Sequence, residues 1–94
     1  MKLLTIKNTP AGDPKKMVAV FMDNGKEKSI KFGAKGSETF AEGASKEKQQ
    51  AYLARHRVGE NWNKINPASL SRYVLWSSTS LPQGIKNFKN KFQK

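Results

Sequence analysis

Two arginines flank the single histidine of this chain in the segment Arg55-His56-Arg57. Paired guanidinium groups can hold a phosphate through bidentate hydrogen bonds, so this segment is a candidate phosphate clamp. Cationic side chains are also favoured at the end of a helix, where they meet the negative end of the helix dipole. The two interpretations are compatible, and the sequence fits both.

A second group of cations lies in the C-terminal segment, which has no aspartate or glutamate after Glu60. A solvated helix face usually mixes charges, because opposite charges four residues apart support each other. This segment presents cations alone, so contact with phosphate stands beside simple solvation as an interpretation. The cations are Lys64, Arg72, Lys86, Lys89, Lys91 and Lys94.

A further lysine, Lys35, lies between glycines in the segment Gly33-Ala34-Lys35-Gly36. Glycine-rich loops can cradle phosphates, but this one lacks the Walker spacing and no helix follows it directly. We interpret it as a bend after a strand that presents Lys35 to a phosphate.

Groups suited to catalysis or metal binding are few. The chain has one histidine, no cysteine and seven carboxylates. A metal site or an activated nucleophile needs more partners than His56 has at any recognisable spacing. No pair of carboxylates has a spacing typical of acid–base catalysis or Mg²⁺ binding. We therefore expect a protein that is not an enzyme, without cofactor or metal, in which His56 is structural.

The aromatic residues Trp62, Tyr73 and Trp76 allow two interpretations. Such rings stack on exposed bases in proteins that bind single-stranded nucleic acids. In so small a domain we favour the interpretation that they belong to the core. No RNP, zinc-finger or basic-zipper pattern is present.

The first third of the chain predicts strands that would position these groups. Leu3–Ile6 favours a strand, and residues 8–15, with two prolines, predict a flexible loop. Asn24-Gly25 is typical of a tight hairpin turn and predicts a β-hairpin over residues 16–33. Alternation along the second strand predicts that Ile30 and Phe32 point inward.

The rest of the chain predicts three helices. Ser45 is a suitable N-cap for a helix that ends near Val58, and Asn66-Pro67 begins a second helix that reaches about Trp76. Residues 80–83 form a capping pattern before a third helix, whose apolar stripe is Leu81, Ile85, Phe88 and Phe92. The predicted fold is a single α+β domain over residues 1–94: a small antiparallel sheet, made of the N-terminal strand plus the hairpin, packed by these helices.

Charge is the strongest feature of the composition, with 18 lysines and arginines against seven acidic residues and a net charge of +11. A folded chain with this imbalance repels itself, and a nucleic-acid backbone is the commonest anionic partner. No apolar run is long enough to span a membrane or to form a signal peptide. We expect an intracellular protein that is neither secreted nor bound to a membrane.

Several segments resemble a family of small basic proteins of unassigned function, encoded by large double-stranded DNA viruses of amoebae and algae. The resemblance covers about residues 16–93 and is most specific at Phe32-Gly33-Ala34-Lys35-Gly36 and Tyr52-Leu53-Ala54-Arg55-His56. Relatives often have a histidine after the glycine loop. This chain has Ser37-Glu38-Thr39-Phe40-Ala41-Glu42-Gly43 there, so a site built on two histidines is not expected. The resemblance implies a viral context and no mechanism.

These observations predict a non-enzymatic, largely sequence-independent DNA-binding protein for packaging or organising a viral genome, located in the virion or in the host cytoplasm or virus factory. Double-stranded DNA is the expected partner, and the sequence leaves the preference for DNA or RNA open. The alternative is a structural virion protein whose basic surface docks acidic virion proteins. We expect the first and third helices to pack on one sheet face and to form one basic surface from Lys35, Arg55, Arg57, Arg72, Lys86, Lys89 and Lys91.

Overall fold

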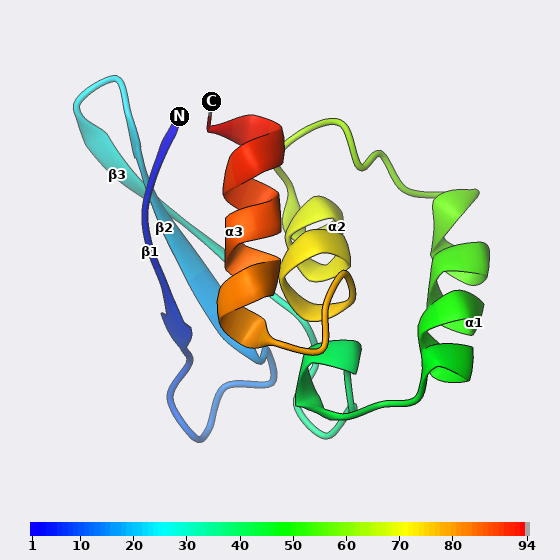
Figure 1. Ribbon diagram of the computed structural model, residues 1–94. Helices are drawn as coiled ribbons and strands as arrows, with labels where there is room; N and C mark the ends of the chain where they lie inside the picture. Colours follow the sequence, from blue (N-terminus) through cyan, green and yellow to red (C-terminus); the bar gives the residue numbers. More distant parts are fainter. Residues whose placement is uncertain (94) are drawn as a thin grey trace.

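Three antiparallel strands begin the chain in the computed structural model, which describes residues 1–93. They are β1 (Lys2–Asn8), β2 (Met17–Asp23) and β3 (Lys26–Phe32), arranged in the order β1-β2-β3 (Figure 1). Asn24 and Gly25 both have positive φ angles, 53° and 81°, as a two-residue hairpin turn requires. The predicted hairpin is therefore confirmed.

One face of this sheet carries apolar residues of the core. A bulge in β1 shifts the register between Leu3 and Thr5, so that Leu3 pairs with Phe21 and Ile6 with Ala19. Residues three apart on a regular strand point to opposite faces, and the bulge lets Leu3 and Ile6 share the core face.

On the third strand, Ile30 lies opposite Ala19 and Phe32 lies opposite Met17. Phe32 is fully buried and Ile30 packs against the core, whereas Ser29 and Lys31 are exposed. The alternation expected for this strand is thus confirmed.

The helical half of the chain begins with a short turn, η1 (Phe40–Glu42), and the helix α1 (Lys46–Arg57). The next segment is α2 (Pro67–Leu70), which continues directly into a π-helical turn, η2 (Ser71–Leu75). The last helix is α3 (Leu81–Phe92). The small α+β fold is confirmed, and the predicted second helix is π-helical in its second half.

Side-chain caps begin the three α-helices where the sequence places them. The side chain of Ser45 accepts a hydrogen bond from the backbone of Lys48, and that of Ser80 accepts one from Gln83. Asn66 and Ser69 form a reciprocal capping box with Pro67 in the first turn. These local contacts set the helix starts.

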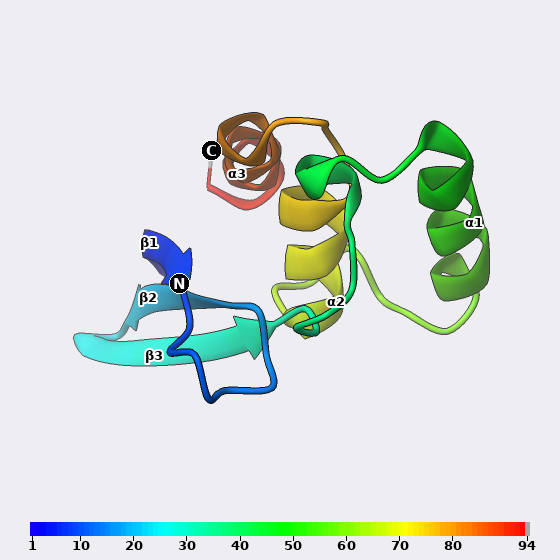
Figure 2. The ribbon, with the colours of Figure 1, turned by 90° about the horizontal axis from the view of Figure 1, so that it is seen from below.

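The sheet, α3 and the α2–η2 segment enclose the core, while α1 lies on the far side of α2 from the sheet (Figure 2). The largest fully buried apolar side chains are Phe21, Phe32, Phe88, Leu70 and Val74. The expectation that α1 and α3 pack on one sheet face is therefore wrong.

The composition of α1 explains its position. None of its residues is buried, and Tyr52, Leu53 and His56 are only partly covered. These three residues form an apolar stripe that is too narrow to cover a sheet. The apolar stripe of α3, which is centred on the fully buried Phe88, is wide enough to do so.

A close backbone contact fixes α3 against η2. A Cβ atom added to Gly84 of α3 would lie 2.2 Å from the carbonyl oxygen of Val74 and 3.0 Å from that of Tyr73. Only glycine permits this approach, so Gly84 sets the distance between the two segments.

The loop expected to be flexible, residues 8–15, is tied to its surroundings by hydrogen bonds. The hydroxyl of Thr9 donates to the carbonyl of Lys16, and Asp13 accepts from the backbone of Lys15 and from the amine of Lys31. The bond from Lys31 connects the loop to β3, and the bond to Lys16 closes the loop just before β2. Over residues 1–93 no helix is long and apolar enough to cross a membrane.

Candidate functional site

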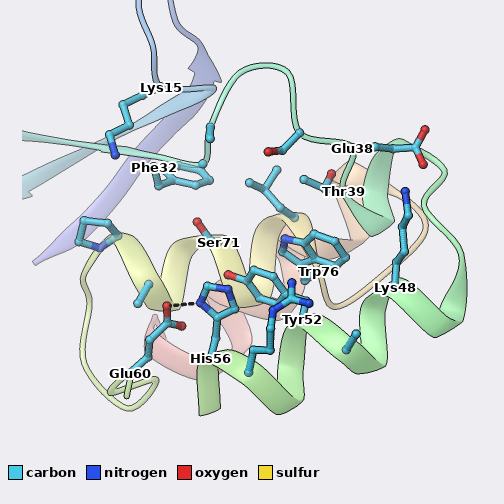
Figure 3. Close-up of a pocket in the computed structure, with 18 residues that line it drawn as sticks. Lys15, Phe32, Glu38, Thr39, Lys48, Tyr52, His56, Glu60, Ser71 and Trp76 are labelled. Carbon is cyan, nitrogen blue, oxygen red and sulfur yellow. Dashed lines mark hydrogen bonds and ion pairs between the residues drawn. The ribbon is translucent and has the colours of Figure 1, made fainter. Parts of the chain in front are cut away.

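A groove with a volume of about 750 Å³ lies between α1 and the loop that follows β3 (Figure 3). One wall comes from α1 and the other from residues 32–39, and the α2–η2 segment supplies Ser71 and Leu75. The volume falls in the range of small-molecule sites. A π-helical turn beside the groove is notable because such turns occur frequently at functional sites.

Three aromatic rings form a stacked column along this groove. The rings of Trp76 and Tyr52 have centroids 4.3 Å apart and planes inclined by 7°. The ring of His56 follows on the other side of Tyr52, at 4.1 Å and 22°. Tyr52 and His56 are four residues apart on one face of α1, and Trp76 follows η2. The column therefore joins two separate parts of the chain.

Glu60 holds the end of this column. Its Oε2 lies 2.7 Å from Nδ1 of His56, and its Oε1 accepts a hydrogen bond of 2.8 Å from Nε1 of Trp62. His56 therefore has a carboxylate partner, which corrects the expectation that no carboxylate lies at a suitable spacing from it. The signal was the spacing of four residues between His56 and Glu60, although Glu60 lies beyond the last helical residue.

The hydroxyl of Tyr52 is held in its neutral form. Burial, together with a smaller effect of the negative charge of Glu60, raises the pKa of Tyr52 to about 12. A phenol with this pKa stays protonated at neutral pH, so Tyr52 contributes a neutral hydroxyl, while its two ring faces are covered by Trp76 and His56.

Charged side chains of both signs line the groove. The cations Lys15, Lys48 and Arg55 are exposed, and the carboxylates are Glu38 and Glu60. Within residues 1–93 none of these cations lies within 4.0 Å of a carboxylate. Arg55 is thus a predicted site residue that the structure places in the groove, whereas Lys15 and Lys48 were missed.

Arg72 takes a different role from the one expected. Its guanidinium carbon lies 5.2 Å from the ring centroid of Trp62 and 5.0 Å from that of Tyr73. Its Nε is buried and has no hydrogen-bond partner among the described residues. The cation–π contacts place the Trp62 loop against η2, so Arg72 is not the centre of an open basic surface.

Lys35 and Arg57 lie near the groove but do not line it. The amine of Lys35 donates a hydrogen bond to the carbonyl of Pro10. Arg57 lines a second hollow together with Glu60, Trp62 and other residues of the loop after α1. Both side chains are exposed.

The lysines of α3 point in different directions. Lys91 donates to Oδ1 of Asn63 at 3.1 Å, whereas Lys89 lines a hollow with Met1 and Leu3 at the opposite flank. Residues two apart on a helix point about 160° apart, which explains the divergence. Because α1 also lies away from the sheet, the residues predicted to form one basic surface do not form it.

Comparison with known proteins gives one result. A family model described as "Family of unknown function (DUF5754)" matches residues 5–56, more than half of the chain. The matched segment runs from β1 into α1 and includes Lys48, Tyr52, Arg55 and His56 of the groove. No curated protein and no solved structure matches the chain.

Proposed function

The chain belongs to this family of unknown function (DUF5754), and we propose that it is a non-enzymatic protein that binds nucleic acid largely independently of sequence. Double-stranded DNA is the proposed main partner. The resemblance to small basic viral proteins supports a role in organising or packaging a viral genome.

The observation that carries this proposal is the number of cations left without carboxylate partners. Within residues 1–93 only Lys16, Lys28 and Lys31 lie within 4.0 Å of a carboxylate among the lysines and arginines. All three arginines of the chain are outside such pairs. Phosphates would neutralise these side chains and release counterions, which favours binding entropically.

The distribution of the cations supports binding without sequence preference. They lie on the sheet, the loops, α1 and α3 rather than on one recognition helix. Each exposed cation contributes little alone, because water and salt screen it. Affinity would then be a sum of many phosphate contacts, which carry no sequence information.

A second candidate is a structural virion protein that docks acidic partners. The observation in its favour is the sheet face that no helix covers (Figure 2). On β2 this face carries Val18, Val20 and Met22, the last two partly exposed, beside Lys7 and Lys31 on the neighbouring strands. An apolar strand flanked by cations fits a protein surface with acidic rim residues.

Salt-dependent binding to duplex DNA tests the proposed function. The logarithm of the binding constant should fall linearly with the logarithm of salt concentration, by about 0.9 per phosphate contacted. Fluorescence anisotropy with duplexes of unrelated sequence should give equal affinities. If no duplex binds at physiological salt, while an acidic virion protein co-purifies, the second candidate replaces the first.

Two triple variants test whether binding is spread over the surface. Changing Lys86, Lys89 and Lys91 of α3 to Gln should reduce the salt slope by at most about 3, because these side chains point in different directions. Changing Lys2, Lys7 and Lys26, which are exposed lysines of the sheet, should reduce the slope by a similar amount. A loss confined to one of the two variants would show that a single face binds DNA.

A further inference from the structure

We propose that the groove between α1 and residues 32–39 binds one unpaired nucleotide of a single strand, with the base against the aromatic column and the phosphates at Lys48 and Arg55. This inference rests on the proposed function, which it deepens by naming a site and a substrate class. It adds a preference for unpaired segments to the general attraction for phosphates.

The shape of the groove favours a single nucleotide. Its volume of about 750 Å³ is that of a small-molecule site, and it is open along one side (Figure 3). In a duplex each base is stacked and its faces are covered, so the rings of the groove cannot reach them. An unpaired base presents its faces and its hydrogen-bonding edge to a protein.

The aromatic column supplies the surface for the base. His56, Tyr52 and Trp76 all line the groove, and their rings are already ordered by mutual stacking. Tyr52 lies between the other two rings and Trp76 is buried, so the outer face of His56, at the exposed end of the column, is the ring face left for a base. Glu60 orients the imidazole of His56 at 2.7 Å and is thus a positioning residue. Because these side chains are already ordered, they lose little conformational entropy when a base binds. Stacking of this kind tolerates every base.

The cations of α1 are placed for the backbone of the strand. Lys48 and Arg55 are seven residues apart, which puts them on the same side of the helix and about 10 Å apart along its axis. Lys15 lies across the groove on the β1–β2 loop. Since none of them is paired with a carboxylate in the described chain, all are available to phosphates.

The carboxylates favour a ligand that carries a base over a bare anion. Glu38 lies at the same end of the groove as Lys48, and Glu60 lies at the other end (Figure 3). Carboxylates repel free phosphate but accept hydrogen bonds from exocyclic amino groups of bases. Glu60 is already engaged by His56 and Trp62, which leaves Glu38 as the acceptor.

The variant His56→Ala tests the base contact, with binding of labelled single-stranded DNA followed by fluorescence anisotropy. The unaltered chain should bind a base-bearing oligomer about tenfold more tightly than an abasic oligomer of the same length, and inorganic phosphate at equal concentration should not displace the oligomer. His56→Ala should remove the difference between the two oligomers. Equal binding of both oligomers by the unaltered chain, or an unchanged difference in His56→Ala, overturns the inference.

A matched pair of double variants tests the groove itself. Lys48→Gln with Arg55→Gln should weaken single-strand binding about tenfold more than duplex binding. The control, Lys46→Gln with Arg57→Gln, removes equal charge from the same helix outside the groove and should weaken both ligands alike. If the two variants behave identically while duplex binding persists, the groove is wrong and the proposed function stands. If neither ligand binds the unaltered chain, both fail.

Discussion

The ring of Tyr52 lies parallel to the ring of Trp76, with centroids 4.3 Å apart, and this contact attaches α1 to the rest of the molecule. It is reinforced by a hydrogen bond of 2.8 Å from the amide of Gln49 to the carbonyl of Trp76. No residue of α1 is buried, so the helix has little other apolar surface to hold it. The groove therefore depends on this pair for one of its walls.

Replacing Tyr52 by Leu should loosen α1 more than it lowers global stability. Loss of the aromatic pair should lower the free energy of local unfolding by about 1 kcal/mol, in addition to the loss of buried apolar area. Amide hydrogen exchange should then accelerate about fivefold along α1 and little in the sheet, because regions with few buried contacts open locally. Gln50→Ala, an exposed change on the same helix, is the control. Unchanged exchange in α1 after Tyr52→Leu would contradict this attachment.

Phe88 should be the most costly position of α3. Its side chain is fully buried, with ring centroids 6.2 Å from Phe21 and 4.8 Å from Phe92. Phe88→Ala should lower the free energy of unfolding by about 3–5 kcal/mol, measured by urea denaturation. Val58→Ala removes an 88% exposed side chain and should change little. Similar midpoints for both variants would place Phe88 outside the core.

Gly84→Ala should destabilise the protein, although alanine is normally the better helix former. Helix propensity alone predicts that this substitution raises the free energy of unfolding by about 1 kcal/mol. The added Cβ would lie 2.2 Å from the backbone oxygen of Val74, so α3 must move away from η2, at a cost of about 1–3 kcal/mol. Gly12→Ala has free space around it and is the control. A raised melting temperature for Gly84→Ala would refute the close contact.

Two carboxylates should make stability fall in acid. Hydrogen bonds from Lys31 and from the backbone of Lys15 lower the pKa of Asp13 from 3.8. Burial raises the pKa of Glu42, but hydrogen bonds from Lys16 and Thr39 outweigh it and lower the pKa from 4.5. A carboxyl whose pKa is lower in the folded state than in the unfolded state stabilises the folded protein at pH values above its unfolded-state pKa. This stabilisation is lost as the pH falls through the pKa of the folded state.

The measurement is urea unfolding of the unaltered chain and of Asp13→Asn with Glu42→Gln. The unaltered chain should be more stable than the variant at pH 7, and the gap should narrow at pH 3. High salt should also narrow the gap at pH 7, because it screens exposed ion pairs. A gap that is the same at both pH values would show that the two carboxylates are not stabilised in the folded state.

Local structure could be predicted from the sequence because its signals act over a few residues. Asn24-Gly25 tolerates positive φ, and Ser45, Asn66 and Ser80 cap the helix that each precedes. The periodic stripe of α3 identified its buried face, including Phe88. Each of these preferences is expressed by the chain itself, without help from distant residues.

The candidate site could be predicted only in part. Net charge and the position of Arg55 follow from the sequence, as does the helix that carries Arg55. The pairing of His56 with Glu60 and the place of Arg72 under Trp62 do not, because each depends on how the loop after α1 folds back. Loop conformation is set by contacts with the packed body rather than by local preference.

The sequence by itself determined the strands, the hairpin turn, the helix starts, the apolar face of α3 and the excess of positive charge. Only the tertiary structure decided that α1 stands away from the sheet and that Tyr52 completes a column with Trp76. The physical reason is that a half-buried stripe such as that of α1 can pack against several surfaces with similar gain. Which surface it meets is settled by the shape of the core already formed by the sheet, η2 and α3.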